Sequence, residues 1–161
     1  MKHIIIGSGV IGRATGELLE AHKQDVCYND INSDLMKKMK KDGKNVEHNI
    51  NNEYDLYWIC TAEWNVSDVL ESIEKKESRI VIRSTIKPYD IILYKNKYKF
   101  EHIAHVPEFL REKTALSDIF DSDRILLERM ILIWNEFFQT FFVIVILQKY
   151  FVLQRNLHLS N

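Results

Sequence analysis

A glycine-rich segment near the N-terminus has the spacing of a phosphate-binding turn. The segment IIIGSGVIGRATG places Gly7, Gly9 and Gly12 in a G-x-G-x-x-G pattern, after an apolar run and before a helical pattern. In such a turn the first glycine permits a tight bend, the second lets the backbone approach a pyrophosphate, and the third lets the helix pack close to the strand. The free N–H groups at the helix start face the anion, so Val10 and Ile11 are candidate cofactor contacts.

A carboxylate follows the glycines at the position where a dinucleotide needs one. Asp30 closes the apolar run VCYND, about 20 residues after the glycines, where a carboxylate accepts hydrogen bonds from an adenosine ribose. It would repel a ribose 2′-phosphate, so the pattern predicts NAD rather than NADP as the cofactor. The alternative is a strand–turn–helix unit whose glycines serve packing alone.

A second candidate segment, HVPEFLREKTALSDIFDSDRI, spans residues 105–125 and follows a predicted strand. Its glutamates Glu108 and Glu112 are four residues apart, a spacing that puts two side chains on one helix face. An exposed helical turn is therefore the plain interpretation, and a carboxylate site is the functional one. His105, a lone histidine at a strand end, is expected to be structural.

Alternating apolar runs and helical patterns must position these segments. Strands are predicted over residues 3–7, 25–30, 55–60, 79–84 and 101–105, with a short one at 45–49, and helices over residues 12–22, 33–43, 65–76 and 87–98. The second helix is expected to run from a Ser33 cap to Gly43, and the fourth to hold Pro88 in its first turn. The alternation predicts an α/β fold, a Rossmann-type, doubly wound, mainly parallel sheet covered on both faces.

The last part of the chain differs in composition. From Leu126 to Leu153 it is dense in isoleucine, leucine, phenylalanine and valine, but polar residues interrupt every window of the roughly 20 apolar residues that a membrane span needs. We expect a nucleotide-binding domain over residues 1–125 and an apolar helical tail over residues 126–161. The preferred interpretation is that the tail is buried or faces a partner chain or second copy. A membrane-associated helix is the second interpretation. The third is that the tail is not a natural continuation of the domain.

The composition narrows the classes of partner. The 161 residues suit one domain, and 22 basic residues against 23 acidic ones leave no basic footprint for nucleic acid. The one dense basic cluster, residues 37–41, is typical of a solvated helix face. Cys27 and Cys60 lie in apolar runs and are expected to be buried free thiols, with no disulfide and no metal site. No signal-peptide pattern precedes the first strand, so a cytoplasmic protein is expected.

Four motifs together resemble successive landmarks of the UDP-glucose/GDP-mannose dehydrogenase family. They are GSGVIGRATG, ICTAEW, VIRSTIKP and VPEFLREKTALSDIFDSDRI, and the resemblance covers about residues 1–125. It implies the N-terminal NAD-binding domain of an enzyme that oxidises the C6 alcohol of a nucleotide sugar to a carboxylate, using two NAD.

The resemblance also implies a nucleotide-sugar site in the second segment. The residues that would line it are Glu108, Phe109, Leu110, Arg111 and Glu112. Glu108 would activate or orient the water that hydrolyses a covalent intermediate, which requires a carboxylate within hydrogen-bond reach of that water.

Three residues would lie along the cofactor by the same resemblance. Glu112 and Thr85 would lie near the nicotinamide, where Thr85 would help to position the catalytic water. Thr61 would contact the cofactor. The candidate catalytic residues are therefore Glu108, Glu112 and Thr85.

Several positions depart from the family pattern, and the segment before DLYWIC is short. The departures are Ala62, Tyr89, Asp90, Val106, Lys113 and Ser122. The family's nucleophilic cysteine lies in a C-terminal domain, with a catalytic lysine and asparagine in a central segment. Cys27 and Cys60 cannot replace that nucleophile, and a thiolate is needed to hold the aldehyde and pass a thioester to water. We therefore expect this chain alone to bind NAD without completing the four-electron oxidation.

Three interpretations follow. The first is a nucleotide-sugar dehydrogenase that is truncated or works with a separate chain. The second is a stand-alone, non-catalytic dinucleotide-binding module or a decayed fragment. The third is a Rossmann dehydrogenase of the hydroxyacid or 6-phosphogluconate type, which shares the glycine loop but does not account for PEFLRE.

Overall fold

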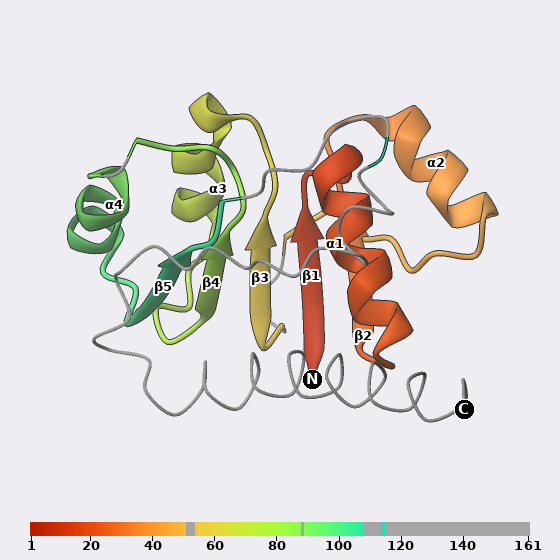
Figure 1. Ribbon diagram of the computed structural model, residues 1–161, viewed down its shortest axis with the longest axis horizontal. Helices are drawn as coiled ribbons and strands as arrows, with labels where there is room; N and C mark the ends of the chain where they lie inside the picture. The colour runs from red at the N-terminus through yellow and green to blue at the C-terminus, as the bar shows by residue number, and fades with distance from the viewer. Residues whose placement is uncertain (51–53, 88, 108–113, 115–161) are drawn as a thin grey trace, which may run out of the picture. The chain divides into compact units, whose positions relative to one another are not determined.

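The computed structural model describes residues 1–50, 54–87, 89–107 and 114, which form a parallel sheet flanked by helices (Figure 1). The strands are β1 (Lys2–Ile6), β2 (Asp25–Asn29), β3 (Leu56–Ile59), β4 (Arg79–Ile82) and β5 (His102–His105). The helices are α1 (Val10–Ala21), α2 (Ser33–Lys41), α3 (Val66–Ser72) and α4 (Asp90–Tyr98), with a 3₁₀ turn η1 (Glu63–Asn65) before α3. Pro88, the domain boundary predicted at residue 125 and the predicted tail lie outside the described residues.

The strand order is β2-β1-β3-β4-β5, and every neighbouring pair is parallel. Beyond β2, Val46 forms an isolated parallel bridge with Tyr28. With that bridge included, the order is that of dinucleotide-binding sheets, in which the direction of winding reverses at β1. Right-handed crossovers then put α1 and α2 on one face and α3 and α4 on the other. The prediction of a doubly wound parallel sheet is confirmed.

The central strands are buried on both faces. Ile4, Ile5 and Ile6 of β1 are at most 3% exposed, and the residues of β3 are at most 4% exposed. Continuous apolar runs of this kind suit strands that helices cover from both sides. α1 packs against β1 and β2, and Gly16 allows the approach, since a Cβ there would lie 2.3 Å from the Tyr28 hydroxyl. No helix in the described part of the chain is long and apolar enough to cross a membrane.

Two elements are shorter than the sequence predicts. The strand predicted over residues 45–49 is reduced to the bridge at Val46, because the Asn29 side chain donates to the carbonyls of Glu47 (2.8 Å) and His48 (3.1 Å) and replaces the ladder. The helix predicted over residues 65–76 is wrong at its end, since α3 stops at Ser72. Ile73 leaves the helix in an extended conformation and is fully buried.

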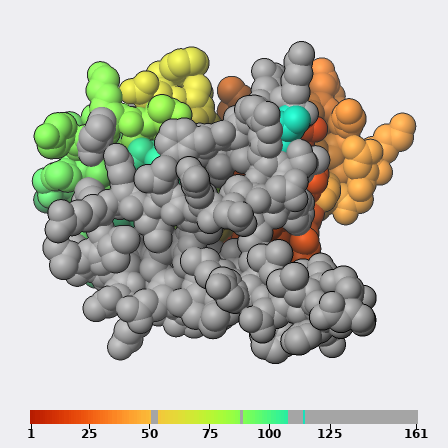
Figure 2. Space-filling view, in the orientation of Figure 1, coloured from red at the N-terminus to blue at the C-terminus, as the bar shows by residue number. Residues whose placement is uncertain are grey.

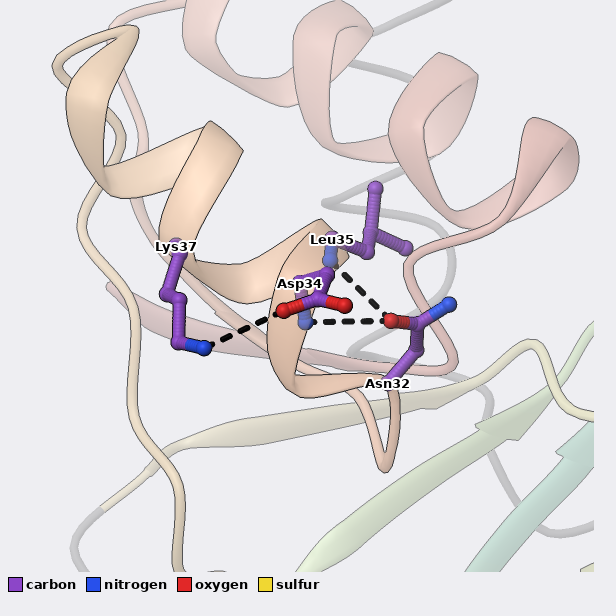
Figure 3. A network of polar contacts seen from close by, with 4 residues as sticks. All are labelled: Asn32, Asp34, Leu35 and Lys37. Carbon is purple, nitrogen blue, oxygen red and sulfur yellow. Dashed lines mark hydrogen bonds and ion pairs between the residues drawn. The ribbon is translucent and has the colours of Figure 1, made fainter.

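The cap of α2 also differs from the prediction. Asn32, not Ser33, is the N-cap, and its side chain accepts hydrogen bonds from the N–H groups of Asp34 and Leu35 at 3.1 Å each (Figure 3). The predicted stop is confirmed, because Gly43 adopts a φ of +82° just after the helix. The lysines at residues 37, 38, 40 and 41 are exposed on α2, which is orange in Figure 2.

A buried histidine lies near the start of the sheet. His3 is fully buried, and its Nδ1 accepts from Trp58 Nε1 (3.1 Å). Nε2 therefore carries the proton and faces the Gln24 side-chain oxygen at 3.4 Å. Burial lowers the pKa of His3 from 6.5 to about 4, because the charged imidazolium loses its hydration.

We expect Asn32→Ala to lower the free energy of unfolding by about 1 kcal/mol, because two N–H groups at the start of α2 lose their acceptor. Urea denaturation followed by circular dichroism measures the change. Ser33→Ala is the matched control and should leave the midpoint nearly unchanged. Equal losses in both variants would contradict the assignment of the cap.

A second prediction concerns acid. The unfolded chain binds a proton at His3 more readily than the folded chain, so stability falls as pH drops from about 6.5 towards 4. The loss attributable to His3 is up to about 3 kcal/mol. Urea denaturation at about pH 7 and pH 5 should show a flatter pH dependence of the free energy of unfolding for His3→Leu than for wild type. An unchanged slope in His3→Leu would contradict the prediction.

Candidate functional site

The carboxyl ends of the parallel strands bring several predicted site residues to one edge of the sheet. The glycine loop follows β1, Asp30 follows β2, Thr61 lies two residues after β3, and Thr85 lies three residues after β4. In open α/β sheets this edge, at the point where the winding reverses, is where ligands bind. The segment from Glu108 to Glu112 lies outside the described residues, so its place in the site remains a prediction.

Two glycines of the loop are required by the protein's own packing. Gly7 has a φ of +90°, and a Cβ there would lie 2.7 Å from the carbonyl oxygen of Cys60. A Cβ on Gly12 would lie only 1.9 Å from the carbonyl oxygen of Gly7. Since no real Cβ approaches a backbone oxygen so closely, both positions demand glycine for the fold, whether or not a ligand binds.

Gly9 is different, because neither packing nor conformation demands a glycine there. Its φ of −68° is not in the left-handed region that favours glycine, and a Cβ would meet nothing within 4 Å. The alternative that the glycines serve packing alone therefore accounts for Gly7 and Gly12 but not for Gly9. The exposed backbone at Gly9 leaves room for a ligand beside the loop.

The start of α1 adds positive potential at the same place. Gly9 is the N-cap of the helix and supplies no side chain to cap it, and the first turn holds no acidic residue. The first N–H groups of a helix have no partner within it, and the helix dipole is positive at this end. Val10 and Ile11, both partly exposed, form the start of this first turn, because α1 begins two residues before the predicted helix. The arrangement suits an anion.

Asp30 is held in place by the loop that it faces. Its Oδ2 accepts from the Ser8 N–H (2.7 Å), and its Oδ1 accepts from the Asn32 N–H (2.8 Å). A carboxylate offers about four acceptor positions, so two further hydrogen bonds remain available. Asp30 is only partly buried. It is thus oriented by the backbone and open to a ligand's hydroxyl groups.

The loops after β3 and β4 and the end of β5 are tied together by a residue that the sequence analysis missed. The buried Ser84 donates from Oγ to the Thr61 carbonyl (2.6 Å), and its own carbonyl accepts from His105 Nε2 (3.1 Å). His105 is therefore structural, as predicted. Thr85 is exposed and Thr61 partly so. The only sign of this role in the sequence was the position of Ser84, a small hydroxyl residue directly before Thr85 at the end of a predicted strand.

Neither cysteine is a reactive thiolate. Cys27 is buried in β2, and burial raises its pKa. Cys60 lies one residue past β3 rather than inside it, and it is only partly buried, not buried as expected. Loss of hydration around its sulfur nevertheless raises the pKa of the thiol to about 12. A neutral thiol is a poor nucleophile. Among the described residues, no group of three or more histidine, cysteine, aspartate or glutamate side chains is placed to hold a metal ion.

Comparison with known proteins supports a dehydrogenase relationship. No protein-family model matches the chain. UDP-N-acetyl-D-mannosamine dehydrogenase from Methanococcus maripaludis is 26% identical to it, over 78% of this chain and 38% of the relative. The chain therefore spans about 38% of the length of this curated relative. The similarity confirms the resemblance to nucleotide-sugar dehydrogenases that the motifs indicate.

Solved structures share the fold. UDP-D-ManNAc dehydrogenase from Pyrococcus horikoshii aligns with a TM-score of 0.62 and 18% identity over 73% of this chain and 38% of its own. 3-Hydroxyisobutyrate dehydrogenase from Mycobacterium tuberculosis aligns with a TM-score of 0.61 and 17% identity over 72% of this chain and 43% of its own. Because dehydrogenases of different substrates match equally well, the fold alone does not choose among the substrates.

The two glycines Gly9 and Gly12 should respond differently to a methyl group. Gly12→Ala forces a Cβ into the Gly7 carbonyl and should lower the free energy of unfolding by about 3 kcal/mol or more. Gly9→Ala meets open space and should lower it by no more than about 1 kcal/mol, the cost of alanine in place of glycine at the N-cap of a helix. Parallel thermal and urea denaturation of the two variants checks this. Equal destabilisation would show that Gly9 is also a packing residue.

Proposed function

We propose, from this chain's resemblance to nucleotide-sugar dehydrogenases, that its glycine-loop edge binds NAD. The single observation that carries the proposal is Gly9. Its missing side chain is explained neither by backbone conformation nor by protein contacts. A pyrophosphate lying against Gly9 and the start of α1 explains it, because the second glycine of this motif admits the anion to the backbone.

Asp30 supports NAD over NADP. Its carboxylate is fixed by the N–H groups of Ser8 and Asn32 and retains acceptor positions for the two hydroxyls of an adenosine ribose. A 2′-phosphate would bring a second negative charge against this carboxylate, with no arginine among the first residues of α2 to accommodate it. When bound, NAD would accept a hydride from a substrate carbon.

We further propose that the substrate is a nucleotide sugar whose C6 alcohol is oxidised to a carboxylate. Sequence similarity to a UDP-N-acetyl-D-mannosamine dehydrogenase supports this substrate class over hydroxyacids, because the hydroxyacid dehydrogenase that aligns with the chain supports only a shared fold. Thr61 would then contact the cofactor, and Thr85 would lie near its nicotinamide. Glu108, Phe109, Leu110, Arg111 and Glu112 would line the sugar site, with Glu108 and Glu112 beside the reacting carbon. A cytoplasmic setting and a partner chain or second copy remain predictions.

The oxidation needs a thiolate that this sequence does not supply. The chain has two cysteines, and both are neutral thiols held by burial. The proposed division of labour is that the described edge holds the dinucleotide, and residues outside this sequence supply the nucleophile.

NAD binding is tested first by isothermal titration of the full chain. We expect wild type to bind NAD, and to bind NADP at least about tenfold more weakly, because Asp30 repels the 2′-phosphate. Gly9→Ala should abolish NAD binding while the fold is retained, since its methyl group occupies the anion's place. Asp30→Ala should lower the affinity for NAD and reduce the ratio of the NAD affinity to the NADP affinity. Failure of the folded wild-type chain to bind NAD would sink the proposal and favour a decayed fragment.

Catalysis is tested separately. The purified chain should bind a nucleotide sugar yet form no uronic acid from UDP-glucose, UDP-N-acetyl-D-mannosamine or GDP-mannose in the presence of NAD. Product analysis by mass spectrometry checks the outcome, and binding of the three sugars identifies the preferred one. Robust uronate formation would contradict the proposed division, because neither Cys27 nor Cys60 is placed or charged to serve as the nucleophile.

A further inference from the structure

Arg13 stands in an unusual place for a basic residue. It is the fourth residue of α1 and is exposed, and the first turn before it contains no acidic side chain. A positive charge near a helix N-terminus opposes the helix dipole, so in the absence of an anion the placement is unfavourable. The sequence analysis assigned Arg13 no role.

The side chain of Arg13 turns back towards the glycine loop. Its Nε donates to the carbonyl oxygen of Gly9 at 3.4 Å, and the same oxygen accepts the Arg13 backbone N–H at 3.0 Å. Among the described residues this is the only hydrogen bond of the side chain, and it forms no ion pair there, not even with Glu17 one turn later. The two terminal nitrogens of the guanidinium therefore have donors to spare.

The distances put those donors within reach of the proposed anion position. Four residues into a helix correspond to about 4.5 Å of rise from its first residue, which is shorter than an extended arginine side chain. The contact with the Gly9 carbonyl keeps the Arg13 side chain beside the residue whose missing Cβ leaves open space. A guanidinium presents parallel N–H groups that match two phosphate oxygens.

We propose that Arg13 is a pyrophosphate-binding residue, with its guanidinium closing over the phosphates that lie against Gly9. The inference rests on the proposed dinucleotide function and adds to it a side-chain contact beyond the backbone cradle. It also explains the unfavourable position, because a bound pyrophosphate reverses the sign of the local interaction. The competing explanation is that Arg13 only tethers the loop through the Gly9 carbonyl.

The test compares Arg13→Gln, which keeps a side-chain donor but removes the charge, with wild type and with Arg13→Lys. Each variant is titrated with NAD at several salt concentrations, and with adenosine, which lacks phosphates, by ligand-observed NMR. Lys41→Gln is the matched control, because it removes one exposed positive charge from the last turn of α2. Thermal denaturation without ligand accompanies every variant.

We expect Arg13→Gln to bind NAD about tenfold more weakly, as loss of a charge-assisted hydrogen bond predicts. The salt dependence should become shallower, adenosine binding should not change, and the ligand-free melting temperature should not fall. Arg13→Lys should recover part of the affinity, and Lys41→Gln should match wild type.

Two outcomes overturn the inference while leaving the proposed function intact. In one, wild type and Arg13→Gln bind NAD equally with equal salt dependence. In the other, Arg13→Gln weakens NAD and adenosine to the same degree, which assigns Arg13 a loop-tethering role. A folded wild-type chain that binds no NAD overturns the proposed function and this inference together.

Discussion

The contact between Gly12 and the Gly7 carbonyl is the constraint on which the rest of the site depends. A methyl group at Gly12 would lie 1.9 Å from that oxygen, so the helix meets the loop with no space for a side chain. This approach brings the start of α1 to the end of β1, at the place where the winding of the sheet reverses. A helix displaced by even one side-chain thickness would point its N–H groups elsewhere. The position of the anion site therefore follows from backbone packing.

The remaining contacts at the edge hold the loops around this junction. Asp30 links the loop after β1 to the turn before α2 through Ser8 and Asn32. Ser84 links the loop after β3 and the loop after β4 to the end of β5. Since a parallel sheet places all its carboxyl ends together, a few backbone-directed hydrogen bonds link the described loops of this edge. Side chains that would bind a ligand are thus held by bonds that are independent of the ligand.

The two groups of glycines separate what the fold requires from what binding requires. Gly7, Gly12 and Gly16 each fill a position where a Cβ would collide with backbone or with Tyr28. Gly9 fills none. The two cysteines take no part in binding or catalysis by this account. Loss of hydration raises the pKa of Cys27 and Cys60, so both thiols stay protonated and are poor nucleophiles. Among the described residues, the glycine loop therefore leaves room for a ligand at Gly9, and neither cysteine is a charged thiolate.

The sequence by itself determined the parallel sheet, the glycine turn, Asp30 at the end of β2 and the stop of α2 at Gly43. These features depend on local patterns: apolar runs, residue spacing and a positive φ that glycine adopts without strain. Only the tertiary structure decided that Asn32 caps α2 and that Ile73 ends α3 early. It also decided that Asn29 limits the strand predicted over residues 45–49 to a bridge at Val46. It also showed that Gly9 and Gly12, two glycines of one motif, differ in role, because packing requires a glycine only at Gly12. The bonds from Asn29 to Glu47 and His48 join segments 18 and 19 residues apart, and no spacing along the chain encodes such a contact. The Asn32 cap and the approach of Gly12 to Gly7 are local contacts, and which neighbouring atoms meet is set by the backbone of the folded chain.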